Sequence, residues 1–191
     1  MNDKKQTALV IGGGSAGMEA SIKIAQAGYK VILVEKMPVL GGVLGQLHSS
    51  FPHWENPQDL LDNKVKQIEK LNQITVLTGM TVNSVSREDG FYLVGLQGVN
   101  QGDNRIVKVD AVVLATGFEM FDASVYGEYG HGIYPNVLDS LEFEAKLKEW
   151  GSGQGQPPQS VAFFKCVGSR DRSKGNPYCS KVCCMYTAKQ A

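Results

Sequence analysis

A glycine turn between an apolar strand and a helix constrains the fold of this chain most. Thr7–Ile11 is an apolar run of strand length and leads directly into Gly12-Gly-Gly-Ser-Ala-Gly17. Apolar residues at helical spacing follow as far as Gly28, and Lys30–Glu35 then has the composition of a buried parallel strand. This order predicts a βαβ unit, and therefore an α/β fold that begins near the amino terminus.

The glycines of this turn have the spacing Gly-x-Gly-x-x-Gly, which is typical of dinucleotide-binding turns. The first glycine makes a tight turn, the second lets the backbone approach a pyrophosphate, and the third lets the helix pack on the sheet. The phosphates would then lie at the positive amino end of the helix. The residues predicted to contact the nucleotide here are Gly12, Gly14, Ser15, Ala16 and Gly17.

An acidic residue at the end of the second strand supports this interpretation. Glu35 lies 18 residues beyond Gly17, where a carboxylate can accept hydrogen bonds from ribose hydroxyls. The glycine pattern alone has another explanation, because turns collect glycine for steric reasons. The alternative is a structural βαβ turn with a surface glutamate. The strand, the helix and the acid together favour a dinucleotide site.

Length and composition bound the class of function. The 191 residues have room for one substantial domain, or for one domain and part of another. With 19 basic and 19 acidic residues the formal charge is zero, so charge gives no reason to expect nucleic acid or an anionic membrane as a partner. No apolar stretch approaches the ~20 residues of a membrane span, and the polar residues 1–6 contain no signal-peptide core. We therefore expect a cytoplasmic protein without a membrane span.

A second glycine pair follows the second strand. Pro38 ends that strand, and Gly41 and Gly42 allow another close approach of the backbone. A loop whose glycines serve only its turn geometry is the alternative. The order of strand, acid, short linker and glycine pair resembles flavoproteins that have two dinucleotide-binding domains. The resemblance implies that FAD rather than NAD occupies the first site, with Lys36, Gly41 and Gly42 near it.

The middle of the chain alternates helical and strand patterns. Residues 45–57 are irregular and contain His48 and His53, which we interpret as surface residues rather than catalytic groups. The predicted elements that follow are a helix over residues 58–71, a strand over Ile74–Thr78, and an antiparallel excursion over about residues 81–109 with a turn at residues 100–104.

The chain then returns to a strand over residues 110–117, which we predict to be buried and to end in Ala115-Thr116-Gly117. Small residues at the end of a strand let a backbone lie against a ligand. In the flavoprotein class that the chain resembles, this segment closes on the ADP half of FAD. The resemblance also implies that Val82 touches the adenine through its backbone.

The carboxyl-terminal part begins with a helix and a linker. The helix is predicted over residues 140–150, with Asp139 or Ser140 as its cap. Residues 151–159 combine glycines with a proline pair and form the clearest linker of the sequence. A short strand over residues 160–164 is predicted to lead into the first cysteine of the chain.

Four cysteines gather near the carboxyl end in the pattern Cys-x12-Cys-x3-Cys-Cys. They are Cys166, Cys179, Cys183 and Cys184. The loop between the first two contains arginine and lysine residues, which balance the negative charge of a thiolate site. Such a set is suited to ligate a 4Fe-4S cluster. Zinc is an alternative, although structural zinc sites usually draw on two short Cys-x-x-Cys-like knuckles, and a thiol or disulfide redox site is another.

Two stretches around these cysteines resemble a known family. Phe164-Lys-Cys-Val-Gly-Ser-Arg-Asp171 and Tyr178-Cys-Ser-Lys-Val-Cys-Cys-Met185 are similar to the signature of the A-type flavoprotein subunit of heterodisulfide reductase. The relatives of that flavoprotein include the A-type subunits of quinone-interacting membrane-bound oxidoreductases. Residues 134–137 and 140–143 fit the family as well, and the similarity covers essentially the whole chain. It implies that the four cysteines hold a 4Fe-4S cluster close to FAD.

Two departures from this family bear on the architecture. Many members carry extra cysteines where this chain has Trp54-Glu-Asn-Pro57, so we expect no further clusters. The family also continues past the point that corresponds to Ala191, into a second dinucleotide domain and a segment that completes the FAD site. We therefore expect a truncated or split member, with a Rossmann-like FAD-binding domain over residues 1–150, a linker over 151–159, and an iron-sulfur-binding segment over 160–191 that starts the missing second domain.

The resemblance predicts an oxidoreductase subunit that passes electrons between FAD and a 4Fe-4S cluster. Its predicted partners are other subunits of a redox complex, either heterodisulfide reductase B- and C-like subunits or a hydrogenase or dehydrogenase module, and a separate polypeptide that completes the FAD site. We assign no catalytic residue, because this chemistry belongs to the cofactors.

Two alternatives to this function come from other classes. A pyridine-nucleotide-disulfide oxidoreductase of the glutathione-reductase branch has a Cys-x4-Cys pair after the glycine pair. This chain has residues 43–48 there, without sulfur, which argues against that enzyme. The other alternative is a truncated FAD half-domain that serves as an assembly scaffold for a larger complex.

Overall fold

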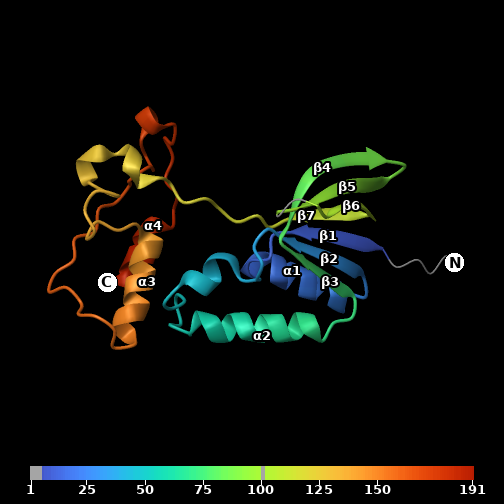
Figure 1. Cartoon of the computed structure of the whole chain (residues 1–191), viewed down its shortest axis with the longest axis horizontal. Coiled ribbons are helices and arrows are strands. Elements are labelled where there is room, and N and C mark those ends of the chain that lie inside the picture. The colour runs from blue at the N-terminus through green and yellow to red at the C-terminus, as the bar shows by residue number, and fades with distance from the viewer. Residues whose placement is uncertain (1–5, 100–101) are drawn as a thin grey trace. The chain divides into compact units, whose positions relative to one another are not determined.

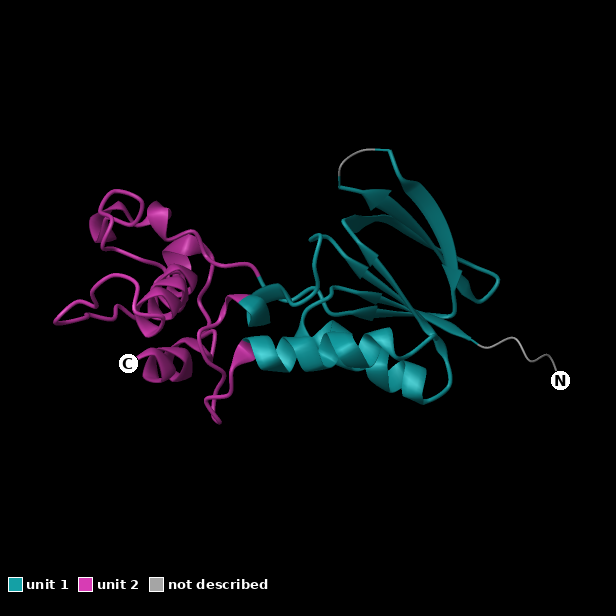
Figure 2. Cartoon of the chain, turned by 60° about the horizontal axis from the view of Figure 1, so that its bottom comes forward, with its two compact units in different colours: residues 1–45, 58–118 teal, residues 46–57, 119–191 magenta. Residues whose placement is uncertain are grey.

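The computed structural model describes residues 6–99 and 102–191 (Figure 1). The predicted turn at residues 100–104 lies partly outside the described residues, as does most of the polar start of the chain. The chain divides into two compact units (Figure 2). Unit 1 contains Met1–Gly45 and Gln58–Phe118, and unit 2 contains Gln46–Pro57 and Glu119–Ala191. Within the described part of the chain, no helix has the length and apolar character needed to cross a membrane.

A parallel sheet of four strands forms the centre of unit 1 (Figure 1). In their order across the sheet, the strands are β3 (Ile74–Thr78), β2 (Lys30–Glu35), β1 (Thr7–Ile11) and β7 (Ala111–Leu114). The helix α1 (Ser15–Gln26) connects β1 to β2, and these two strands pair in parallel. The predicted βαβ unit and the α/β, Rossmann-like fold class are therefore confirmed.

The predicted antiparallel excursion is also present in unit 1. It is a three-stranded sheet made of β4 (Met80–Glu88), β5 (Phe91–Gly98) and β6 (Asn104–Val109). Both strand pairs are antiparallel, and a bulge between Val82 and Ser84 shifts the register of β4 against β5. Such a bulge bends the strand and increases its twist.

Apolar side chains cover both faces of the parallel sheet. On one face, Val10 packs in a cluster with Met18 of α1 and with side chains of α2 (Pro57–Glu69). On the other face, Leu9 packs in a second cluster with Val94 of the antiparallel sheet. Successive residues of a strand point to opposite faces, so two neighbours in β1 belong to two different clusters. This arrangement explains why β1 and β2 are continuously apolar instead of alternating.

The strand β7 differs from its prediction in length and burial. It spans Ala111–Leu114 rather than residues 110–117, and Ala115-Thr116-Gly117 follow it without regular structure. It lies at the edge of the sheet, and Leu114 is 75% exposed. The prediction of a buried strand is wrong because, among the described residues, β7 has a strand partner on one side only.

Unit 2 is built mainly from helices and loops. It contains α3 (Ser140–Gly151), α4 (Cys183–Gln190) and the short 3-10 helices η2 (Ala123–Val125), η3 (Gly127–Tyr129) and η4 (Arg172–Lys174). Asp139 caps α3 as predicted, because its side chain accepts from the backbone N–H groups of Leu141 and Glu142. The Glu142 side chain accepts from the backbone N–H of Asp139 in return, which completes a capping box.

The predicted strand over residues 160–164 is wrong. Residues 160–166 have no regular secondary structure, and residues 160–165 are exposed. A strand needs a neighbouring strand for its backbone hydrogen bonds. The two sheets of the described residues both lie in unit 1 and offer no such neighbour here.

The two units also divide the chain differently from the predicted domains. The predicted boundary lies after residue 150, whereas the first unit ends at Phe118. The helix α3 therefore belongs to the same unit as the cysteines, and the predicted linker over residues 151–159 lies inside that unit. Packing explains the difference, because Glu144 of α3 contacts Lys189 and Gln190 of α4.

Candidate functional site

Two glycines of the turn after β1 are required by close backbone contacts. A Cβ on Gly12 would lie 2.2 Å from the backbone oxygen of Ala115, and Gly12 has a φ of +106°. A Cβ on Gly17 would lie 1.8 Å from the backbone oxygen of Gly12. Contacts this short exclude any side chain, so Gly12 and Gly17 allow β1, α1 and the end of β7 to approach one another.

Gly14 is different, because a Cβ there would meet nothing within 4 Å. Gly14 is the N-cap of α1, and no side chain of the described residues caps this helix end or places an acidic group in its first turn. Ser15 and Ala16, at the start of α1, are exposed. An open and uncapped helix amino terminus binds phosphate through its backbone N–H groups and its dipole. The space beside Gly14 therefore fits the pyrophosphate of a dinucleotide.

The second glycine pair lies against this turn, as predicted from its resemblance to flavoproteins. The backbone N–H of Gly41 donates to the oxygen of Gly13 at 2.9 Å, and Gly14 and Gly41 form an isolated parallel bridge. A Cβ on Gly42 would lie 3.2 Å from the Cα of Gly14. Gly42 also begins a short 3-10 helix, η1 (Gly42–Gln46). The structure thus brings the two glycine motifs together at one end of the sheet.

Glu35 organises the glycine turn through both of its carboxylate oxygens. It is only 6% exposed, and its Oε2 accepts from the backbone N–H of Gly13 at 2.5 Å. Its Oε1 accepts from the backbone N–H of Met37 at 2.8 Å. A carboxylate has about four acceptor positions, so each oxygen retains capacity for a further donor. The predicted bond to a ribose hydroxyl remains a prediction, while Lys36 next to it is exposed.

The other residues predicted for the nucleotide lie on two different elements. The N–H of Ala115 donates to the oxygen of Ile11 at 2.8 Å, which keeps the residues after β7 beside β1. Thr116 and Gly117 are exposed. Val82 lies in β4, where its side chain packs against the apolar cluster between the two sheets. Contact of its backbone with adenine therefore stays a prediction.

A hollow of about 650 Å³ lies elsewhere in unit 1. It is lined by Thr7, Lys30, Val31, Ile32, Asn72, Gln73, Thr75, Val107 and Lys108. Thr7 and Lys30 are the first residues of β1 and β2. The hollow is therefore at the amino ends of the parallel strands, whereas ligands of open α/β sheets bind at the carboxyl ends, where the glycine turn lies.

In unit 2, a hydrogen-bonded loop connects the first two cysteines. Asp171 and Asn176 exchange both backbone hydrogen bonds, at 2.8 and 3.0 Å. The N–H of Arg170 donates to the oxygen of Tyr178 at 2.9 Å. The N–H of Ser180 donates to the hydroxyl of Ser169 at 3.1 Å. The loop therefore runs out and back, and its two ends, near Cys166 and Cys179, lie side by side.

The four cysteine thiols are all free. The N–H of Lys181 donates to the sulfur of Cys179 at 3.3 Å, and Nη1 of Arg170 lies 4.0 Å from the sulfur of Cys166. Cys183 and Cys184 are the first residues of α4, where the helix dipole favours negative charge. A site that gathers thiolates needs donors and positive charge of this kind.

Backbone strain is concentrated in the cysteine segment. Cys166, Arg170 and Lys181 have φ values of +61°, +61° and +64°, a region that residues other than glycine rarely adopt. The other such residues in the described chain are Trp54 and Asp89. Each strained residue costs on the order of 1–3 kcal/mol and persists only where its surroundings hold it, which is common at functional sites. The donor set and the strain together fit a metal-cluster site.

Ligand spacing separates the metal alternatives. Zn–S bonds of about 2.3 Å place the sulfurs of a tetrahedral zinc site about 3.8 Å apart. In the described residues, three ligand atoms within 4.8 Å of one another occur only at His131, Asp139 and Glu142, and not among the cysteines. A 4Fe-4S cluster spaces its cysteines more widely, because each binds a different iron. Of the metal alternatives, the cysteines are thus better suited to a cluster than to a single zinc ion.

The group of His131, Asp139 and Glu142 has a structural explanation. Both carboxylates already belong to the capping box of α3, and His131 Nε2 lies 3.0 Å from Glu142 Oε2. The backbone N–H of Asp139 lowers the pKa of Glu142, and the nearby His131 contributes in the same direction. A helix amino terminus is also an unfavourable place for a cation. These side chains stabilise the start of α3.

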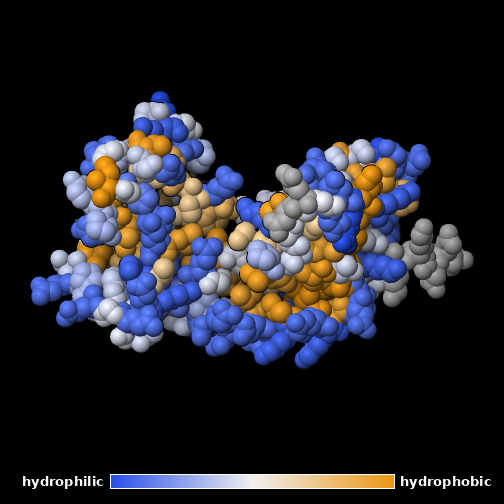
Figure 3. Space-filling view, in the orientation of Figure 1, coloured by the Kyte–Doolittle hydropathy of each residue, from blue (hydrophilic) through white to orange (hydrophobic). Residues whose placement is uncertain are grey.

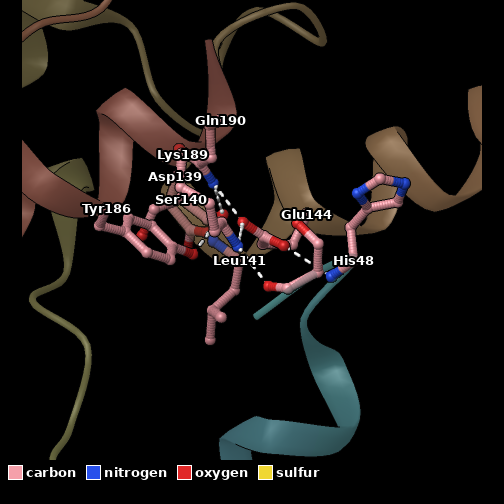
Figure 4. A network of polar contacts seen from close by, with 9 residues as sticks. His48, Asp139, Ser140, Leu141, Glu144, Tyr186, Lys189 and Gln190 are labelled. Carbon is pink, nitrogen blue, oxygen red and sulfur yellow. Dashed lines mark hydrogen bonds and ion pairs between the residues drawn. The ribbon is translucent and has the colours of Figure 1, made fainter. Parts of the chain in front are cut away.

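A buried charged network joins α3 to α4 (Figure 4). Glu144 is fully buried, and its Oε1 lies 2.5 Å from Nζ of Lys189. The other oxygen of Glu144 accepts from the backbone N–H of His48 at 2.6 Å. Gln190 donates to Glu144 at 2.9 Å and to the oxygen of Ser140 at 3.0 Å. The network thus holds the helix that starts with two cysteines. No pattern in the sequence indicated it, because its members are dispersed and individually ordinary.

Tyr186 of α4 provides a test of this packing at alkaline pH. Its hydroxyl donates to the oxygen of Ser140 at 2.9 Å, and burial raises the pKa of Tyr186 to about 12. A raised pKa contributes stability that is present below the tyrosine's ordinary pKa of 10.0 and is lost as the pH rises towards 12. We expect the free energy of unfolding to fall between these pH values, and to fall less in Tyr186→Phe. Equal slopes in urea titrations of the two proteins would contradict this.

Apolar side chains lie exposed beside the cysteines. Figure 3 shows apolar residues at the surface of unit 2. The exposed members of the cysteine segment are Phe164, Tyr178, Val182 and Met185. Exposed apolar side chains gathered in one segment are a feature of interaction surfaces.

Comparisons with known proteins agree with this description. The model of a family described as pyridine nucleotide-disulphide oxidoreductase matches residues 6–159. The A-type subunit of the ferredoxin/F420H2-dependent CoB–CoM heterodisulfide reductase of Methanosarcina acetivorans is 27% identical over 266 residues, which cover 96% of this chain and 34% of that protein. An A-type iron-sulfur subunit of the CoB–CoM heterodisulfide reductase of Methanopyrus kandleri is 28% identical over 271 residues, which cover 99% of this chain and 41% of the relative. The chain thus spans well under half the length of these relatives.

A solved structure supports the fold. The L-proline dehydrogenase of P. horikoshii superposes with a TM-score of 0.52 and 23% sequence identity. The match covers 59% of this chain and 22% of that protein. At this identity the likeness concerns the fold alone.

Proposed function

The chain belongs to the pyridine nucleotide-disulphide oxidoreductase family, and we propose that it is an electron-transfer subunit with FAD and a 4Fe-4S cluster in a heterodisulfide reductase-like complex. The observation that carries this proposal is the combination, in one chain, of an open dinucleotide turn at Gly14 with four free thiols in a strained loop and helix start. FAD exchanges electrons in pairs or singly, and a 4Fe-4S cluster exchanges them one at a time.

The residues of unit 1 would bind FAD. The amino end of α1 would hold the pyrophosphate through backbone N–H groups, and Glu35 would accept from a ribose hydroxyl. We assign the following residues to this site: Gly12, Gly14, Ser15, Ala16, Gly17, Glu35, Lys36, Gly41, Gly42, Val82, Ala115, Thr116 and Gly117.

The residues of unit 2 would bind the cluster. Cys166, Cys179, Cys183 and Cys184 would be its ligands. Arg170 and the amino end of α4 would offset the negative charge of the thiolates. The name of the Methanopyrus kandleri relative includes "iron-sulfur", which supports this assignment.

We also propose that the chain works with other polypeptides. Its relatives are named as single subunits of larger enzymes and are much longer, and the exposed apolar residues of the cysteine segment suit a covered surface. The proposed partners are heterodisulfide reductase B- and C-like subunits or a hydrogenase or dehydrogenase module, together with a polypeptide that completes the FAD site. We do not propose disulfide exchange of the glutathione-reductase type, because η1 and its neighbours contain no cysteine.

Anaerobic reconstitution of the purified chain with FAD, iron and sulfide tests the proposal. We expect a flavin absorption spectrum together with iron and sulfide bound at about four atoms each per chain. A flavin spectrum without bound iron would contradict the electron-transfer function. Flavin retention only after co-expression with a second polypeptide would instead favour the assembly-scaffold alternative.

The glycine turn allows binding to be separated from folding. We expect Gly14→Ala to lower FAD affinity by about tenfold or more, because its Cβ would enter the space that the pyrophosphate needs. Its effect on unfolding of the FAD-free chain should stay within about 1 kcal/mol, the cost of alanine at an N-cap. Gly17→Ala is the matched comparison: its Cβ would clash with Gly12, so we expect about 1–3 kcal/mol of destabilisation. Fluorescence titration with FAD and urea unfolding measure the two effects, and equal FAD affinity of Gly14→Ala and the wild type would contradict the assignment.

A further inference from the structure

The loop between Cys166 and Cys179 is held from outside by an aromatic segment that precedes α3. Rings of this segment stack in a row, with centroid distances of 5.8 Å for Phe121–Tyr126 and 5.6 Å for Tyr126–Tyr129. Tyr129 continues the row to Phe164, also at 5.6 Å, two residues before the first cysteine. The row lies entirely within unit 2. It forms a rigid surface beside the cysteine loop.

One polar contact connects the middle of this row to the tip of the loop. Tyr126 is 9% exposed, and its hydroxyl donates a short hydrogen bond to Oδ2 of Asp171. The other oxygen of Asp171 accepts from the backbone N–H of Ser173 at 2.8 Å and from its hydroxyl at 2.7 Å. Asp171 thereby caps η4, while its backbone pairs with Asn176 across the loop. A single carboxylate therefore joins the loop's own hydrogen bonds to the aromatic row.

Two further contacts act on the same loop. Nζ of Lys174 lies 4.9 Å from the ring centroid of Tyr126 and donates to the oxygen of Val125 at 3.3 Å. Gly168, with a φ of +71°, lies so close to the ring of Phe121 that a Cβ would come within 2.2 Å of it. The loop is thus in contact with the aromatic segment at its beginning, its tip and its return.

Charge and protonation favour the same arrangement. The hydrogen bond from Tyr126 lowers the pKa of Asp171, and bonds from Ser173 act in the same direction. The bond to Asp171 in turn raises the pKa of Tyr126. Around neutral pH the carboxylate is therefore ionised and the phenol carries its proton, which is the donor-acceptor pair that the contact needs. Lys174 is the charged group that faces this pair from the loop, and it supports the ionised carboxylate.

We propose that Tyr126 and Asp171 are positioning residues that hold the cysteine loop in its ligand-ready conformation before a cluster enters. This inference rests on the proposed cluster function. Neither side chain touches a thiol in the described structure: they act through the loop that carries Cys166 and Cys179. The strained φ of Cys166 and Arg170 needs such an outside support, because an isolated loop would relax.

The first test compares Tyr126→Phe with Tyr129→Phe in the reconstituted full chain. Both changes remove one hydroxyl from the same aromatic row, and only the first removes the contact with Asp171. We expect Tyr126→Phe to release iron to a chelator about tenfold faster than wild type, the factor expected when a hydrogen bond to a charged group is lost. Tyr129→Phe should stay within about twofold. We also expect the electron paramagnetic resonance signal of the reduced cluster to shift in Tyr126→Phe alone, which a general loss of stability would not cause.

The second test uses the metal-free chain and is independent of the cluster. Hydrogen exchange of the loop amides, such as those of Arg170 and Asn176, should be about tenfold faster in Tyr126→Phe than in Tyr129→Phe. Asp171→Asn keeps an acceptor oxygen, so we expect an intermediate rate. If the wild type binds no iron but exchange responds as described, the cluster function fails and the positioning of the loop stands. If both tyrosine variants exchange and release iron alike, the positioning role is overturned.

Discussion

Replacing Cys179 by serine is expected to reduce the bound iron and sulfide from about four atoms each per chain to nearly none. Cys179 is exposed, and the N–H of Lys181 points at its sulfur from 3.3 Å, as it would towards a ligated thiolate. A serine hydroxyl stays protonated near neutral pH and cannot replace the thiolate as a ligand. The loss should be close to complete, because the chain has only four cysteines and none can substitute.

The FAD content of the same preparation serves as the internal control. The residues assigned to FAD lie in unit 1, whereas Cys179 lies in unit 2, so we expect the Cys179→Ser chain to keep its flavin affinity within about twofold. Iron, sulfide and flavin analyses of one anaerobic sample measure all three. Full retention of iron by the variant would remove Cys179 from the ligand set. Stoichiometric zinc in the wild type, without sulfide, would replace the cluster by the zinc alternative.

Glu144→Ala is expected to destabilise unit 2 by about 3–5 kcal/mol, the usual cost of breaking a buried ion pair by removing one partner. The Lys189 side chain is 3% exposed, so its ammonium would be left without its carboxylate and with little access to water. The change would also leave the N–H of His48 and the amide of Gln190 without their acceptor. The start of α4, which carries two cysteines, should then lose its fixed position on α3.

Glu149→Ala is the matched control on the same helix. Glu149 pairs with Lys146 at 2.8 Å, and about half of each side chain is exposed, so its removal should cost no more than about 0.5 kcal/mol. The two tryptophans of the chain, Trp54 and Trp150, both belong to unit 2, and their fluorescence therefore reports on the unfolding of that unit. Equal midpoints of urea unfolding for the two variants would show that the buried pair does not hold α4.

Local patterns predicted the nucleotide half of the molecule well. The strand, glycine turn, helix and second strand all depend on residues within about one helical turn of each other, through steric limits on glycine and through apolar periodicity. The close contacts of Gly12 and Gly17 and the open space at Gly14 agree with the role given to each glycine. The capping box of Asp139 and Glu142 was predictable in part for the same reason, because its members are three residues apart.

The errors fall where a prediction depended on distant partners. Residues 160–164 have a strand-like composition and no strand beside them in the described structure, so they remain irregular. The strand β7 has the apolar residues of a buried strand, but its position at the sheet edge leaves Leu114 exposed. Composition reports what a segment can do, and its neighbours decide whether it does so.

The sequence alone determined the βαβ unit, the spacing of the cysteines and the resemblance to a flavoprotein family, because each is written in residues that are close along the chain. Only the tertiary structure decided that Glu144 meets Lys189 and that Tyr126 meets Asp171, pairs that are 45 residues apart in each case. Such pairs form when separate segments pack together and exclude water, which makes an unpaired polar group costly and a matched pair specific. The cysteines were therefore visible in the sequence, and the contacts that hold them in place were not.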